Sequence, residues 1–183
     1  MRVVAGAARG RKLKAPLGCR IRPTSDRVKE ALFDLLRVEW ESCSVLDLFA
    51  GTGALGIEAL SRGAMSALFV ERDPTAIRFL RQNLEACGMV GRARVVVAEA
   101  IRFLERGARG SSFEVITADP PYGRGLAPRC LSALHRGGWL ARGGVLALEH
   151  SRREDMPDRL GNAVRQDFRR YGDTCISLYS IVE

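Results

Sequence analysis

The fold is decided by the stretch Asp47-Leu48-Phe49-Ala50-Gly51-Thr52-Gly53-Ala54-Leu55-Gly56. It has the pattern of an apolar strand, a glycine-rich loop and the first turn of a helix. Glycine lets a backbone turn sharply and pass close to a ligand. The spacing Gly51-x-Gly53-x-x-Gly56 also matches the dinucleotide-binding pattern, in which the ligand lies where a strand gives way to a helix. The stretch therefore predicts the first unit of a ligand-binding α/β domain.

Strands and helices alternate along the chain from this unit onward. Apolar runs typical of buried strands occupy 45–50, 67–70, 94–98, 114–118 and 145–148, and helical patterns occupy 55–62, 75–87, 101–106 and 126–140. This alternation predicts a parallel sheet covered by helices on both faces. Segments 164–170 and 174–182 flank Tyr171-Gly172-Asp173 and predict a closing antiparallel hairpin. We expect a Rossmann-like α/β domain with a seven-stranded, mostly parallel sheet.

The beginning of the chain is strongly basic. Residues 1–30 hold nine basic and two acidic residues, a net +7 of the +8 carried by the whole chain. A basic segment on a near-neutral domain is typical of a protein with a polyanionic partner, although a merely solubilising terminus would look the same. Segments 2–5 and 11–15 predict a small β-hairpin. We therefore divide the chain into a basic extension that binds a polyanion, 1–23, and an α/β domain, 24–183.

The composition narrows the class of protein. The 183 residues fit one domain, and no apolar run approaches the roughly 20 residues that span a bilayer. The five cysteines are scattered and form no C-x-x-C pair, which argues against a zinc site or a disulfide framework. We expect a cytoplasmic protein that needs neither a membrane nor a metal.

Three carboxylates at predicted strand ends favour one cofactor over another. The glycine loop alone fits either a nicotinamide dinucleotide or S-adenosylmethionine. Asp47, inside the strand, would repel a pyrophosphate but suits the cationic amino-acid end of S-adenosylmethionine. Glu71 stands 20 residues after Gly51, where an acidic residue binds ribose hydroxyls. Glu99 is placed to accept from an adenine amino group, with helix capping as the alternative interpretation.

A second motif, Asp119-Pro120-Pro121-Tyr122, follows the apolar run 113–118. Two prolines cannot donate to a sheet ladder, so the chain leaves the sheet here as a stiff loop. The Asp119 carboxylate and the Pro120 carbonyl could accept the two protons of an NH₂ group, while Tyr122 stacks on the ring that bears it. The alternative is an ordinary turn in which Asp119 binds nearby backbone.

These motifs, in this order, resemble class I S-adenosylmethionine-dependent methyltransferases that act on exocyclic amino groups. The resemblance narrows with Arg9-Gly10-Arg11-Lys12-Leu13, with Arg22-Pro23-Thr24-Ser25-Asp26-Arg27-Val28-Lys29-Glu30-Ala31-Leu32-Phe33, and with 47–63. Over essentially the whole chain it is similar to the bacterial RsmD family. That resemblance implies methylation of the N2 amino group of one guanine in 16S ribosomal RNA.

The predicted site has three parts. The catalytic residues are Asp119, Pro120 and Tyr122, and the cofactor residues are Asp47, Phe49, Gly51, Thr52, Gly53, Glu71, Arg72, Glu99 and Ala100. The RNA-binding residues are Arg9, Arg11, Lys12, Arg20, Arg22 and Arg27.

The family resemblance implies, as partner, 16S rRNA, the small ribosomal subunit or an assembly intermediate, and we expect a monomer. Guanine is implied by the resemblance alone, because the tetrad is shared with adenine-N6 enzymes. An adenine-N6 methyltransferase of DNA or RNA, and more remotely a non-catalytic RNA-binding module, therefore stay open.

Overall fold

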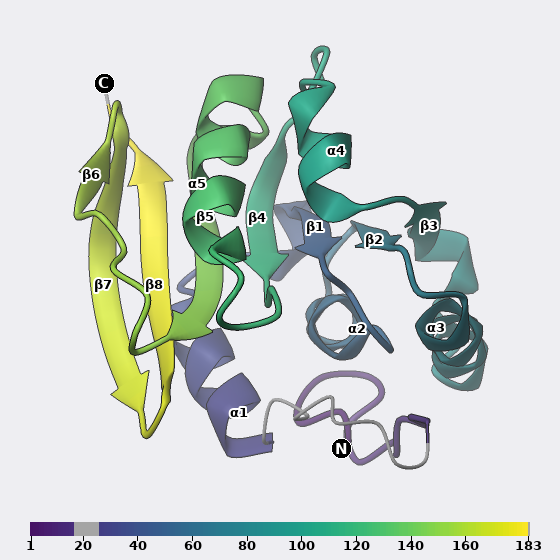
Figure 1. The fold of residues 1–183 in the computed structure, drawn as a ribbon. Coiled ribbons are helices and arrows are strands. Elements are labelled where there is room, and N and C mark those ends of the chain that lie inside the picture. Colours follow the sequence, from purple (N-terminus) through teal and green to yellow (C-terminus); the bar gives the residue numbers. More distant parts are fainter. Residues whose placement is uncertain (17–25, 183) are drawn as a thin grey trace.

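A computed structural model describes residues 1–16 and 26–182 of the chain. Its centre is one eight-stranded sheet with the order β3-β2-β1-β4-β5-β8-β7-β6 (Figure 1). The strands are β1 Ser44–Leu48, β2 Ser66–Glu71, β3 Ala93–Val97, β4 Phe113–Ala118, β5 Leu140–Ser151, β6 Arg159–Leu160, β7 Ala163–Tyr171 and β8 Thr174–Ile181. Strands β1 to β5 run parallel, and β8, β7 and β6 continue the sheet in antiparallel pairs. The predicted parallel sheet with a C-terminal hairpin is confirmed.

The sheet has one strand more than the sequence predicts. The extra strand, β6, is two residues long and pairs with the start of β7 across a turn at Gly161. A strand this short has no hydropathy alternation to detect, so the sequence pattern predicts β7 but not β6. Strand β5 is longer than its apolar run because Leu140 already pairs with Phe113, before a bulge that includes Gly144.

Helices cover both faces of the sheet. They are α1 Asp26–Leu35, α2 Ala54–Ser61, α3 Pro74–Ala86, α4 Ala100–Glu105 and α5 Leu126–Gly137, with short 3-10 turns at Trp40–Ser42 and Val90–Arg92. One core cluster joins α1, α2 and α3 to one face of the sheet, and a second joins α4 and α5 to the other. Neighbouring residues of β1 therefore belong to different cores, Val45 to the first and Leu46 to the second.

The helix ends follow their capping signals. Asp73 accepts from the backbone N–H groups of Thr75 and Ala76, and Pro74 occupies the first helical position of α3. Helix α5 ends earlier than predicted, because Gly138 adopts a left-handed conformation (φ 66°) that terminates it. Within residues 1–16 and 26–182, none of the helices combines the length and apolarity needed to cross a membrane.

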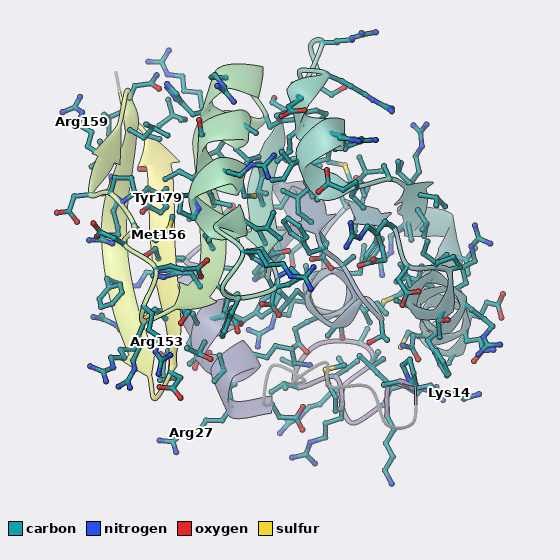
Figure 2. The ribbon with its side chains drawn as sticks, in the orientation of Figure 1. Lys14, Arg27, Arg153, Met156, Arg159 and Tyr179 are labelled. Atoms are coloured by element: carbon teal, nitrogen blue, oxygen red, sulfur yellow. The ribbon has the colours of Figure 1, made fainter. Side chains whose placement is uncertain are left out.

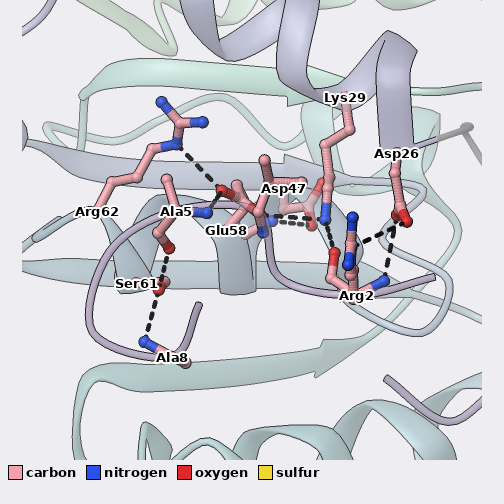
Figure 3. A network of polar contacts seen from close by, with 11 residues as sticks. Arg2, Ala5, Ala8, Asp26, Lys29, Asp47, Glu58, Ser61 and Arg62 are labelled. Carbon is pink, nitrogen blue, oxygen red and sulfur yellow. Dashed lines mark hydrogen bonds and ion pairs between the residues drawn. The ribbon is translucent and has the colours of Figure 1, made fainter. Parts of the chain in front are cut away.

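The N-terminal segment, residues 1–16, is fixed to α2 by a buried ion network (Figure 3). The Glu58 carboxylate accepts from the backbone N–H groups of Val4 (2.8 Å) and Ala5 (2.9 Å). The same carboxylate pairs with Lys29 of α1 at 3.0 Å, and both side chains are fully buried. Arg62 completes the network at 3.1 Å from Glu58. A buried carboxylate is tolerated here because all its partners are charged or strong donors.

The same segment reaches the glycine loop through one buried amide. Asn83 of α3 accepts from the Lys14 N–H (2.8 Å) and donates to the carbonyls of Lys14 and Thr52, each at 3.0 Å. The predicted pairing of 2–5 with 11–15 is present as a short antiparallel bridge between Arg2 and Lys12. The predicted division after residue 23 falls outside the described residues.

Candidate functional site

A cavity of about 1320 Å³ opens at the carboxyl ends of the parallel strands, and Met1 and Val28 also line it. Its walls come from the loops after β1, β2, β3 and β4, and from the facing ends of β5 and β8. Every predicted catalytic and cofactor residue except Gly53 lies in this wall. The volume exceeds the roughly 300–1,000 Å³ of sites for drug-sized ligands, so it has room for two ligands side by side.

The glycine loop is held in an uncommon conformation. Phe49 has a φ of 56°, in the left-handed region that non-glycine residues rarely adopt. The Gly51 N–H donates to Glu71 Oε2 at 2.8 Å, which fixes the loop to the end of β2. A Cβ at Gly53 would lie 2.2 Å from Leu80 Cδ1, so this glycine is required by packing against α3. A contact of Gly53 with the cofactor therefore stays a prediction.

Asp47 lies beneath this loop as a buried carboxylate, 1% exposed. Its Oδ2 accepts from the Gly56 N–H at 2.9 Å, and its Oδ1 accepts from the Thr117 hydroxyl at 3.0 Å. Burial raises the pKa of Asp47 from its ordinary 3.8 to about 7, although both hydrogen bonds oppose the rise. A nearby cation in the cavity would favour the ionised form of this carboxylate.

Two further carboxylates stand at the next strand ends. Glu71 Oε1 accepts from the N–H groups of Arg72 (2.7 Å) and Asp73 (2.8 Å). Glu99 accepts from Ile101 and Arg102 and caps α4, which is the alternative role considered for it. Both side chains also line the cavity. A carboxylate offers about four acceptor positions, so these backbone bonds are compatible with ligand hydroxyl or amino groups.

The tetrad Asp119-Pro120-Pro121-Tyr122 follows β4 and forms another part of the cavity wall. Asp119 is half-buried and Pro120 is buried, directly after β4. The Tyr122 hydroxyl donates to Glu149 Oε1 at 2.6 Å and lies 3.0 Å from the Thr174 hydroxyl. Burial, and then the bond to Glu149, raises the pKa of Tyr122, so the hydroxyl stays protonated. The tetrad therefore lines the cavity, and its Tyr122 is held by residues that are distant in the sequence.

The cavity also contains residues that the sequence did not single out. Glu149 and Thr174 hold Tyr122, and the exposed residues Arg102, Arg124 and Arg129 also line the wall. Glu149 had a detectable signal, because it follows the apolar run 145–148 as Glu71 and Glu99 follow theirs. Thr174 had none, because its place depends on the pairing of β8 with β5.

The four predicted RNA-binding residues that the structure describes lie outside the cavity wall. Arg9, Arg11 and Lys12 are exposed on the N-terminal segment, and Arg27 is exposed at the outer side of α1 (Figure 2). Arg20 and Arg22 lie outside the described residues. No group of three or more His, Cys, Asp or Glu that could hold a metal occurs in 1–16 and 26–182.

The sheet order, the loop after β1 and the carboxylates at successive strand ends define the fold of class I S-adenosylmethionine-dependent methyltransferases. Solved structures agree with this class. The Escherichia coli protein yhhF is 36% identical, with a TM-score of 0.87 over 99% of this chain and 97% of that one. The Thermus thermophilus hypothetical protein TTHA0928 is also 36% identical, with a TM-score of 0.84 and 99% coverage of both chains.

The family is shown by sequence. A model described as conserved hypothetical protein 95 matches residues 1–180. Ribosomal RNA small subunit methyltransferase D of Escherichia coli strain K12 is 40% identical over 86% of this chain and 78% of that protein. The protein of the same name from Haemophilus influenzae is 37% identical over 81% and 78%. The chain belongs to this family, the RsmD family.

Proposed function

We propose that this protein transfers a methyl group from S-adenosylmethionine to the exocyclic N2 amino group of a guanine in small-subunit ribosomal RNA. The observation that carries the proposal is that one cavity holds both motifs, the carboxylate-lined glycine loop and the tetrad. The names of the relatives, ribosomal RNA small subunit methyltransferase D, support the RNA substrate. The protein works as a cytoplasmic monomer on 16S rRNA or on the subunit during assembly.

The β1–β3 side of the cavity fits the cofactor. Asp47 is buried and has a pKa of about 7, and its carboxylate would pair with the cationic amino-acid end of the cofactor. Glu71 would accept from the ribose hydroxyls, and Glu99 with Ala100 would contact the adenine. When bound, S-adenosylmethionine supplies a methyl group already activated by its sulfonium.

The same geometry disfavours a nicotinamide dinucleotide. A pyrophosphate is bound by N–H groups at the start of the helix after the glycine loop. Here the Gly56 N–H donates to Asp47, so a carboxylate stands where phosphate oxygens would need a donor.

The tetrad side supplies what the amino group lacks. The lone pair of a guanine amino nitrogen is delocalised into the ring, which makes the nitrogen a poor nucleophile. Hydrogen bonds from its two protons to the Asp119 carboxylate and the Pro120 carbonyl would favour a pyramidal nitrogen with a localised lone pair. Asp119 would then stabilise the cationic amine and accept its proton. The Tyr122 ring would stack on the base after it leaves its helix or loop.

Transfer of labelled methyl groups tests this proposal. We expect label from S-adenosylmethionine in 16S rRNA or small subunits that lack the modification, and none in large-subunit rRNA. An adenine-N6 DNA enzyme would instead label duplex DNA. A non-catalytic RNA-binding module would bind the RNA without labelling it.

A further inference from the structure

Four exposed arginines line the cavity wall. Arg72 belongs to the predicted cofactor residues, and we define the other three, Arg102, Arg124 and Arg129, as the arginine rim. Arg102 lies on α4, Arg124 in the loop two residues after Tyr122, and Arg129 on α5. All three line the cavity and all three are exposed. Each of the three side chains therefore borders both the cavity and the solvent.

Carboxylates and arginines both line this cavity. The carboxylates of Asp47, Glu71 and Glu99 are engaged by hydrogen bonds from the loops and helix starts around them. The arginine rim differs, because none of its members pairs with a carboxylate anywhere in residues 1–16 and 26–182. Five other arginines of that part of the chain do form such pairs: Arg2, Arg62, Arg152, Arg165 and Arg169. The rim is thus an unneutralised group of positive charges on the cavity wall.

We propose that the arginine rim binds the phosphodiester backbone of the RNA on either side of the target nucleotide. This inference rests on the proposed function. A base that enters the cavity to reach Asp119 leaves its flanking phosphates at the border between cavity and solvent, which the rim shares. Guanidinium groups match phosphate oxygens in charge and in planar, bidentate geometry. The rim holds the nucleotide in place for transfer, and the predicted RNA-binding residues of the N-terminal segment contact more distant phosphates.

The chain offers a matched control for this proposal. Arg106 follows α4, Arg136 lies in the last turn of α5, and Arg109 lies in the loop before β4. All three are exposed and none lines the cavity. The variant R102Q/R124Q/R129Q and the control R106Q/R109Q/R136Q therefore remove the same charge, each with one position in or directly after α4, one in α5 and one in a loop.

The test compares both variants with the unmodified protein on the substrate that it methylates, 16S rRNA or small subunits. We expect the rim variant to raise KM for RNA about tenfold or more at moderate salt. The slope of log affinity against log salt should fall by about 0.7 to 0.9 for each phosphate that the variant no longer binds. The control should stay within about twofold, and binding of S-adenosylhomocysteine should be unchanged in both.

Three results would overturn the inference. Equal losses of RNA affinity in the rim variant and the control would show that net charge alone, and not the position of the rim, causes the effect. An unchanged KM and salt slope in the rim variant would show that the rim does not contact phosphates. Weakened binding of S-adenosylhomocysteine in the rim variant would assign the arginines to the cofactor instead. None of these results would contradict the proposed function. The proposed function fails separately if the unmodified protein methylates neither 16S rRNA nor small subunits.

Discussion

At the β1–β3 end of the cavity, the carboxylates of Glu71 and Glu99 are held by backbone N–H groups, all but one within three residues of the side chain. At the β4–β8 end, the Tyr122 hydroxyl is held by side chains 27 and 52 residues away along the chain. Glu71 and Glu99 are thus organised mainly by their own loops, while Asp47 at the same end also accepts from Thr117 on β4. The second end depends on the alignment of β5 and β8, and its geometry can be disturbed from a distance.

The largest expected effect comes from Asp119 at the tetrad end. Asp119→Ala should lower kcat by more than about a hundredfold, because it removes the group that binds the amino protons and accepts one of them. Binding of S-adenosylhomocysteine, measured by calorimetry, should stay within a few fold, since the cofactor end is separate. Near-normal turnover would show that Asp119 takes no part in the chemistry. An equal loss of cofactor binding would show that the two ends of the cavity do not act separately.

Asp47→Asn should have the opposite effect, because it should weaken cofactor binding. The side chain keeps its shape and can keep its bonds to Gly56 and Thr117, but it loses the charge that pairs with the cofactor cation. Cofactor affinity should fall roughly ten- to a hundredfold, in line with about 1.5–3 kcal/mol for a hydrogen bond to a charged group. Titration with S-adenosylmethionine at a pH of about 7.5, just above the raised pKa, measures this. An unchanged affinity would contradict the role given to Asp47.

The same substitution should stabilise the ligand-free protein. Because the pKa of Asp47 is raised from 3.8 to about 7, ionisation opposes folding. This penalty is absent below a pH of about 4, grows as the pH rises to about 7 and is complete above it, reaching at most roughly 4 kcal/mol. The difference in free energy of unfolding between Asp47→Asn and the unmodified protein should follow this curve in urea titrations. A difference that does not change between about pH 5 and pH 8 would mean that Asp47 is ionised in the fold without penalty.

The long-range contacts at the tetrad end predict a smaller, non-additive effect. Tyr122→Phe keeps the stacking ring and removes the hydroxyl that Glu149 and Thr174 hold, so kcat should fall about tenfold, the equivalent of roughly 1.5 kcal/mol. Glu149→Gln retains an acceptor oxygen and should lose less. If Glu149 acts on catalysis through Tyr122, the double variant should be no slower than Tyr122→Phe alone. Additive losses would show that Glu149 contributes in another way.

The smallest effect is expected from the exposed charges of the N-terminal segment. Replacing Arg9, Arg11 and Lys12 by Gln should weaken RNA binding several-fold and lower its salt slope by about one for each phosphate that is no longer bound. The fold should be unaffected, because the segment is fixed by backbone bonds to Glu58, Ser61 and Asn83. Unchanged salt dependence would place the RNA elsewhere.

The difference between the two ends also explains what could be predicted from the sequence. Alternating apolar runs and caps such as Asp73-Pro74 are local signals, and they predicted the parallel strands and most helices, and with them the strand ends at which Glu71 and Glu99 line the cavity. The two-residue strand β6 left no such signal, whereas the early end of α5 is marked by Gly138, a helix-stop residue inside the predicted range 126–140. The Glu58–Lys29 pair and the Tyr122–Glu149–Thr174 contacts join distant segments, so they became visible only with the fold.

The identity of the methylated nucleoside tests the central claim most directly. Small-subunit RNA labelled by this protein would be digested to nucleosides and analysed by mass spectrometry, with the Asp119→Ala variant as control. The account predicts N2-methylguanosine at a single position, absent from the control. N6-methyladenosine, or a methyl group on a ring atom of any base, would contradict it.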